Sequence, residues 1–76
     1  MLGDLAGDGR GRAGLRETVR VYLAEGSSAP RAAEQLHLHR NTVLYRLGRA
    51  EELLGYAVGE RRLALMLALE LERFGA

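Results

Sequence analysis

Residues 30–54 read PRAAEQLHLHRNTVLYRLGRAEELL, which is the pattern of two short helices joined by a tight turn. The first helix is expected over about 30–37, because Pro30 suits the first turn of a helix. The second is expected over about 40–54, because Gly55 follows it and glycine readily takes the left-handed conformation that ends helices. A short helix, a three-residue break and a longer helix together predict a helix-turn-helix.

The apolar residues of this segment fall where a helix-turn-helix needs them. Ala33 is small, as the first helix requires where the second crosses closely above it. At 100° per residue, Val43, Leu47 and Ala50 lie within about 60° of one another on the second helix. They therefore predict a buried stripe along that helix. Further inward-facing residues are expected at Leu36, Leu38 and Leu54.

We interpret the opposite face of the second helix as a surface that binds double-stranded DNA. Residues 31–50 carry four arginines against one glutamate, a local charge of +3 on a chain whose net charge is +1. Arginine pairs with guanine edges or phosphates, asparagine pairs with adenine, and apolar side chains contact thymine methyl groups. Base or groove contacts are expected from Arg40, Asn41, Leu44 and Tyr45. Phosphate contacts are expected from Ser28, Arg31, His39, Thr42, Arg46 and Arg49.

Several of these residues also have a purely structural interpretation, which the sequence leaves open. The local positive charge is compatible with an ordinary solvated helix face. Arg40 is able to cap a turn, and Asn41 and Thr42 are able to serve the free amides of a first helical turn. Arg46 has three candidate ion-pair partners: Glu25, Glu34 and Glu51.

Two more helices flank this pair. Leu15, Val19 and Leu23 recur at helical spacing, with Tyr22 beside them, and predict a first helix before the helix-turn-helix. A fourth helix is expected over about 60–74. Because short connections join four helices and no segment alternates with period two, the expected fold is all-α: a compact four-helix domain with a central helix-turn-helix.

The N-terminal residues differ in composition from the rest of the chain. Residues 1–14 hold five of the ten glycines, and we expect them to be a flexible linker or the tail of an upstream domain. Leu2 and Leu5 are candidates for such a tail to pack back on the domain. The DNA-binding domain itself is expected over residues 15–76.

The fourth helix is apolar on two sides. One stripe consists of Leu63, Leu67, Leu71 and Phe74, and a second consists of Leu65, Leu69 and Met66. A helix that is apolar all round is usually buried on more than one side. Our hypothesis is that the second stripe meets an upstream domain or a second copy of this chain. The alternative is that the first helix, with Leu2 and Leu5, covers it.

The composition and spacing exclude several classes of function. With no cysteine, the chain has no disulfide and no thiolate metal site. The longest apolar run, 63–69, is far short of the ~20 residues that span a bilayer, and the N-terminal residues resemble no signal peptide. His37 and His39 have no third ligand nearby, and no nucleophile, base and orienting group share a useful spacing. We therefore expect no enzyme activity, cofactor, metal or membrane association, and a cytoplasmic location. The DNA-binding interpretation places the protein at the nucleoid.

Residues 32–47, AAEQLHLHRNTVLYRL, resemble the C-terminal helix-turn-helix of PucR/CdaR-type bacterial transcription regulators. The family pattern has a pair of small residues followed by Leu-His-x-His-Arg-Asn-Thr-x-x-Tyr-Arg-Leu, and the likeness extends over about residues 15–74. Gly48 departs from the pattern, because a longer polar residue is common at that position. A weaker likeness to the Fis-type helix-turn-helix favours a domain without a wing.

The resemblance implies the sequence-specific DNA-binding domain of a transcription regulator that controls a catabolic operon. In such a domain the helix at about 40–54 lies in the major groove, and a sensory domain lies upstream. A homodimer or higher oligomer of the full-length protein is expected, because one short helix rarely gives enough specificity and paired half-sites mirror a two-fold axis. The alternative function is a helical protein-interaction or dimerisation module that uses the apolar fourth helix and does not bind DNA.

Overall fold

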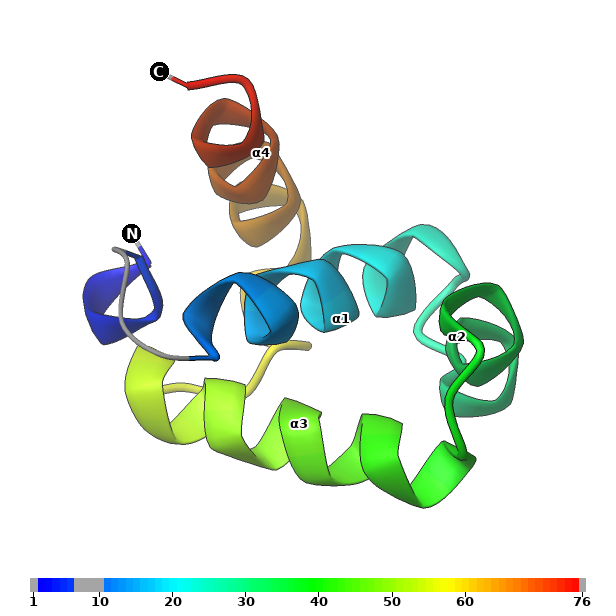
Figure 1. The fold of residues 1–76 in the computed structure, drawn as a ribbon. Helices are drawn as coiled ribbons and strands as arrows, with labels where there is room; N and C mark the ends of the chain where they lie inside the picture. The colour runs from blue at the N-terminus through cyan, green and yellow to red at the C-terminus, as the bar shows by residue number, and fades with distance from the viewer. Residues whose placement is uncertain (1, 7–10, 76) are drawn as a thin grey trace.

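The computed structural model describes residues 2–6 and 11–75, which form four α-helices and one turn of 3₁₀-helix, with no strand among them (Figure 1). In chain order the elements are η1 (Gly3–Leu5), α1 (Arg12–Ala24), α2 (Ala29–Leu36), α3 (Arg40–Leu54) and α4 (Arg62–Arg73). The predicted all-α fold is confirmed. Within the described residues, no helix is long and apolar enough to cross a membrane.

Helix α1 is the centre of the domain, because it packs against each of the other three helices. Figure 1 shows α3 running beside α1 in the opposite direction, with α2 across one end of the pair. Helix α4 packs on α1 alone among the helices, on the side away from α3. The helix-turn-helix and α4 therefore occupy opposite sides of the molecule.

One hydrophobic core joins the inward stripes of all four helices. On α3 the predicted stripe of Val43, Leu47 and Ala50 is buried, and Ala33 of α2 is buried beneath it as expected. Leu36, Leu38 and Leu54 are half-buried at its edge. The buried apolar residues are Leu2, Leu5, Val19, Leu23, Ala32, Ala33, Val43, Leu47, Ala50, Val58, Leu65 and Leu69.

The ends of α2 and α3 are set by capping residues next to them in the sequence. Helix α3 ends where Gly55 takes a left-handed φ of 83°, a conformation that glycine adopts without the steric penalty of a side chain. Helix α2 begins after Ser28, whose Oγ accepts a hydrogen bond from the backbone N–H of Arg31 at 3.3 Å. The expected bounds of α3, 40–54, are confirmed, and those of α2 differ by one residue at each end.

Residues near the N-terminus are part of this core. Helix α1 already begins at Arg12, and η1 packs against α1 and α3. Two hydrogen bonds hold η1 to α1: the Arg12 guanidinium donates to the carbonyl of Asp4 at 2.6 Å, and that of Arg16 donates to the carbonyl of Leu5 at 3.0 Å. Leu5 is fully buried. That residues 1–14 belong to a linker or to the tail of an upstream domain stays a prediction.

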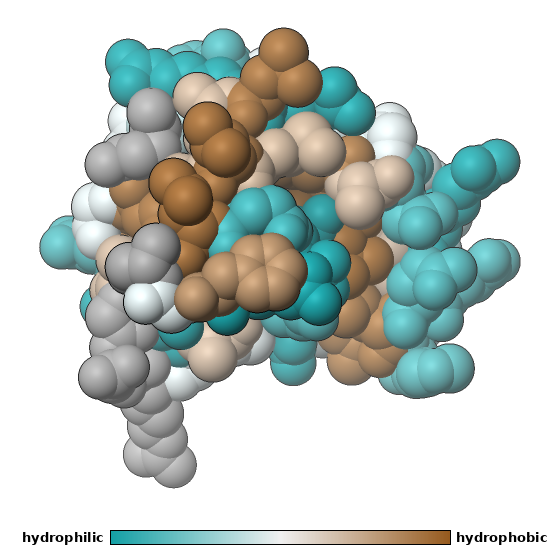
Figure 2. Space-filling model, turned by 90° about the horizontal axis from the view of Figure 1, so that it is seen from above, coloured by the Kyte–Doolittle hydropathy of each residue, from teal (hydrophilic) through white to brown (hydrophobic). Residues whose placement is uncertain are grey.

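The expectation for α4 is wrong in one respect. The second stripe, which we expected to meet another domain or a second copy, is covered within the domain: Leu65 and Leu69 are buried, and Met66 is half-buried. Helix α1 supplies this cover, as the alternative interpretation proposed. The side chains left exposed are instead those of the first stripe, Leu63, Leu67, Leu71 and Phe74. Figure 2, which looks onto the α4 side of the molecule, shows apolar side chains gathered in a band across this face.

Candidate nucleic-acid interface

The turn between α2 and α3 is short and well closed. His37 ends α2 in a left-handed conformation with φ 58°, and the backbone N–H of Leu38 donates to the carbonyl of Ala33 at 2.9 Å. Leu38 is half-buried against the core, so the turn is anchored by an apolar contact as well as by hydrogen bonds. This geometry fixes where α3 begins and which of its faces points outward.

The outward face of α3 combines charged, polar and large apolar side chains. Arg40, Asn41, Gly48 and Arg49 are exposed on it. So are Leu44 and Tyr45, at 51% and 69% of their full accessible surface. A leucine and a tyrosine exposed among arginines on one helix face suit contact with a second molecule better than contact with water alone. The structure therefore brings together all four side chains expected to make base or groove contacts: Arg40, Asn41, Leu44 and Tyr45.

His39 caps α3. Its Nδ1 accepts a hydrogen bond from the backbone N–H of Asn41 at 3.0 Å, so the capping role that the sequence left open for Asn41 and Thr42 belongs to His39. A neutral imidazole that accepts at Nδ1 carries its proton on Nε2. The exposed ring of His39 therefore keeps one N–H donor for a partner beyond the helix. The phosphate contact expected from His39 stays a prediction, and the cap was not anticipated.

The beginning of α2 holds two of the residues expected to contact phosphate. Ser28 caps this helix, and Arg31 is exposed in its first turn. The unpaired N–H groups and the positive end of the dipole make the start of a helix favourable for an anion. Figure 1 shows α2 at the end of the molecule where α3 begins, so both helix starts lie in one region.

Arg46 and Arg49 have different surroundings. The Arg49 guanidinium donates to Glu52 at 2.7 Å, and this hydrogen bond raises the pKa of Arg49 above its ordinary value. Arg46 is half-buried, and its guanidinium lies close to Gly14 of α1. A Cβ atom added at Gly14 would be 3.7 Å from Nη1 of Arg46. Arg46 thus extends along the rim of the face towards α1.

Two findings about ion pairs were not anticipated. None of the ion pairs among the described residues joins Arg46 to Glu25, Glu34 or Glu51, and the Glu51 carboxylate instead accepts a hydrogen bond from the backbone N–H of Val58 at 2.8 Å. The pairing of Arg49 with Glu52 was missed, although the spacing of three residues on a helix is a recognised signal for it. Glu52 therefore places a negative charge beside an arginine expected to contact phosphate.

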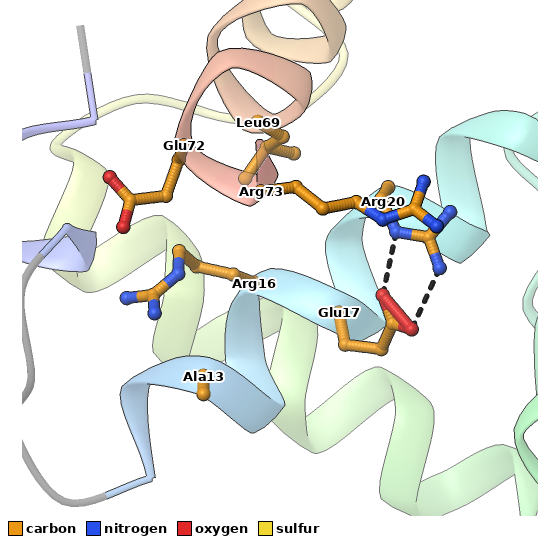
Figure 3. Close-up of a pocket in the computed structure, with 7 residues that line it drawn as sticks. All are labelled: Ala13, Arg16, Glu17, Arg20, Leu69, Glu72 and Arg73. Carbon is orange, nitrogen blue, oxygen red and sulfur yellow. Dashed lines mark hydrogen bonds and ion pairs between the residues drawn. The ribbon is translucent and has the colours of Figure 1, made fainter. Parts of the chain in front are cut away.

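A groove of about 440 Å³ lies between α1 and α4, away from α3 (Figure 3). Its lining is mostly charged: Ala13, Arg16, Glu17, Arg20, Leu69, Glu72 and Arg73. Arg20 donates two hydrogen bonds to Glu17, at 2.6 and 2.7 Å, which hold the pKa of Glu17 below its ordinary value. Small-molecule pockets are lined mainly by apolar groups, so this groove lacks the lining typical of a ligand site. The described residues also contain no cluster of three His, Asp or Glu suited to a metal ion.

Comparison with known proteins agrees with the helix-turn-helix geometry. The chain is 43% identical over 61 residues to the purine catabolism regulatory protein of Bacillus subtilis, which covers 78% of this chain and 12% of that protein. It is 38% identical over 74 residues to an uncharacterized protein in the pkwA 5′ region of Thermomonospora curvata, which covers 97% of this chain and 41% of that protein. The chain thus spans well under two thirds of either relative. No solved structure matched it.

The family model for the PucR C-terminal helix-turn-helix domain matches residues 15–71, three quarters of the chain, from the first turn of α1 almost to the end of α4. This range contains α2, α3 and the whole outward face of α3. The resemblance that the motif of α2 and α3 indicated is thereby confirmed. The chain belongs to the family of PucR C-terminal helix-turn-helix domains, a class of DNA-binding domain found in transcription regulators.

Proposed function

We propose that this domain binds double-stranded DNA sequence-specifically, with α3 lying in the major groove. The observation that carries the proposal is the outward face of α3, where Asn41 and Tyr45 are exposed opposite a fully formed apolar stripe and exposed Arg40 and Leu44 lie beside them. The major groove of B-DNA is about 12 Å wide and admits one α-helix with its side chains. Membership in a helix-turn-helix family supports the same assignment.

The side chains divide into base readers and phosphate contacts. Arg40 and Asn41 carry the donor and acceptor groups that distinguish base pairs, and Leu44 offers an apolar contact for a thymine methyl group. Tyr45, on the same face, reaches the wall of the groove. Phosphate contacts are proposed for Ser28, Arg31, His39, Thr42, Arg46 and Arg49, which lie around this face and at the start of α2.

The Arg49 guanidinium contacts a phosphate only if it breaks its ion pair with Glu52 or donates to both groups, because the two side chains are joined in the free domain. Both are well exposed, at 46% and 65% of their side-chain surface, so water and salt weaken this ion pair. A phosphate then competes effectively for the guanidinium. Glu52 opposes DNA binding by its charge and sets part of the affinity.

The regulatory setting is part of the proposal. The relative from Bacillus subtilis is named as a regulator of purine catabolism, which supports a role for this domain in controlling a catabolic operon in the cytoplasm, at the nucleoid. The relatives are much longer than this chain, which is compatible with a sensory domain elsewhere in the protein. Two or more copies are proposed to read paired half-sites.

A fluorescence anisotropy titration tests DNA binding. The variant Arg31→Ala removes a proposed phosphate contact from the first turn of α2, and Arg73→Ala removes a positive charge from the exposed end of α4 on the opposite side of the molecule. We expect Arg31→Ala to weaken binding to a generic duplex and to flatten the slope of log K against log salt by about 0.9, one phosphate contact. Arg73→Ala is expected to leave the slope unchanged. Equal losses from both variants would show that only overall charge matters.

A further inference from the structure

Helix α4 presents an apolar face that the domain itself does not cover. Leu63 and Phe74 are each 75% exposed, Leu67 is 62% exposed, and Leu71 is 53% exposed. Leu67 lies 200° around the helix from the buried Leu65, at 100° per residue, so α1 packs against the other side of α4. The 3₁₀ turn η1 packs against α1 and α3 and not against α4. The Arg73 guanidinium lies 5.3 Å from the centre of the Phe74 ring, and among the described elements only α1 packs against α4, on its other side.

We propose that a second copy of this chain covers the stripe, in a two-fold contact between the two α4 helices. At on the order of 100 Å² for each exposed large side chain, the four residues present roughly 400–500 Å² per copy. Two copies together bury on the order of 1,000 Å², about the lower limit for a specific interface. The largest apolar patch on a typical monomer is about 300–600 Å² and is often functional. The area predicts a weak dimer.

The spacing of the stripe suits pairing with itself. Leu63, Leu67 and Leu71 form a single row four residues apart, which is a ridge along the helix surface. Two such ridges interdigitate when the helices cross at about −50°, the commonest packing of helices in globular proteins. In a two-fold contact the same patch serves both copies, so Leu67, the middle residue of the row, lies at the crossing point and every contact between the two helices occurs twice. Glu70 and Arg73, beside the row, are paired with each other at 3.7 Å.

The position of α4 decides what such a pair does with DNA, and this step rests on the proposed function. The axis of a two-fold contact lies in the plane of the contact, so the two α4 faces point towards each other. Helix α3 is on the opposite side of α1 from α4, so the two α3 faces point away from each other (Figure 1). A dimer that reads one operator needs both recognition helices on one side of the duplex, about 34 Å apart. A dimer formed through α4 therefore holds two separate DNA duplexes, one on each copy. Two copies bound at adjacent half-sites of one duplex contact each other through a surface other than α4.

Sedimentation of the 76-residue chain tests the contact without DNA. We expect its mass to rise from that of a monomer towards a dimer between ~10 μM and ~1 mM. Leu67→Glu places a charge at the crossing point and is expected to remain monomeric, whereas Ala57→Glu, which adds the same charge at an exposed loop position, dimerises as the wild type does. If Leu67→Glu loses its helical circular dichroism, Leu63→Glu replaces it, because a carboxylate is favourable in the first turn of α4. A wild-type monomer throughout, or a charged-stripe variant that dimerises normally, overturns the proposal.

Energy transfer between two duplexes tests the bridge. One short duplex carries a donor dye and another carries an acceptor, and the wild-type chain at low salt is expected to bring them together. Leu67→Glu is expected to bind each duplex as the wild type does and to lose the transfer signal at least tenfold, while Ala57→Glu retains it. Transfer that survives in Leu67→Glu, or a wild-type dimer that separates when DNA is added, contradicts the bridge. Failure of every variant to bind DNA contradicts the proposed function instead, and sedimentation still decides the α4 contact.

Discussion

Two leucines two residues apart on α4 allow a sharp test of how this helix packs. Leu65 is fully buried against the core, and Leu67 is 62% exposed on the other side of the same helix. Truncation to alanine removes the same atoms in both cases and leaves a good helix former in each place. Any difference in stability therefore reports on burial.

The structure sets the size of the difference. Leu65→Ala removes three buried carbons, worth about 0.8 kcal/mol each, and leaves a cavity, so the expected loss is about 2–5 kcal/mol. A chain of 76 residues has a free energy of unfolding of about 4–11 kcal/mol at ~0.05–0.15 kcal/mol per residue. The loss is thus a large share of the total. Leu67→Ala is expected to change stability by no more than about 0.5 kcal/mol, as surface substitutions usually do.

Urea denaturation followed by far-ultraviolet circular dichroism measures both values. All variants are compared at one low micromolar concentration, so that self-association does not contribute to stability. We expect the midpoint for Leu65→Ala to fall clearly below that of the wild type, with the slope unchanged, and that for Leu67→Ala to coincide with the wild type. Equal losses for the two variants, or a larger loss for Leu67→Ala, would refute the packing of α4 and with it the assignment of the exposed stripe.

Three further predictions concern α3. Glu52→Gln removes the negative charge that pairs with Arg49, so DNA affinity should rise at low salt in an anisotropy titration. Arg49→Ala should lower the affinity. A lower affinity for Glu52→Gln would argue against Arg49 as a phosphate contact. The methyl group added by Gly48→Ala has no neighbouring atom within 4 Å, and alanine is a better helix former than glycine. Urea denaturation should therefore show a free energy of unfolding higher by about 0.5–1 kcal/mol. A lower value would show that Gly48 is packed more tightly than the structure indicates. His39→Ala removes the α3 cap and should lose about 1 kcal/mol, while His39→Asp should restore most of it; equal stability of these two variants would exclude the cap.

The helix-turn-helix was predictable because its signals are local. Pro30 and Ser28 indicate the start of α2, and Gly55 indicates the end of α3 through backbone conformation alone. Val43, Leu47 and Ala50 recur at helical spacing on one side of α3, whereas Leu44 and Tyr45 lie among arginines, so periodicity identifies the inward face without reference to the rest of the chain. Val43 and Leu47 were accordingly placed correctly, and the outward face followed from them.

Other features depend on tertiary contacts that a single sequence does not reveal. Helix α4 carries leucines on two opposite sides, so its periodicity fits two orientations, and only packing against α1 selects the one that buries Leu65. Leu2 and Leu5 were correctly expected to pack on the domain, but no local pattern indicates that η1 packs against α1 and α3. The cap by His39 requires an extended backbone at that residue, ψ 146°, so that the ring folds back to the amide of Asn41.

An amide chemical-shift titration of the 76-residue chain with a generic duplex, at low and moderate salt, tests the central claim most directly, because it reports where DNA touches the domain even when binding is weak. We expect salt-sensitive shifts clustered on residues 28–31 and 39–49, with the exposed stripe of α4 unaffected at a protein concentration where the chain is monomeric. Shifts confined to α4 or to the groove between α1 and α4, or no shifts at low salt, would contradict the assignment of the outward face of α3 as the DNA-binding surface.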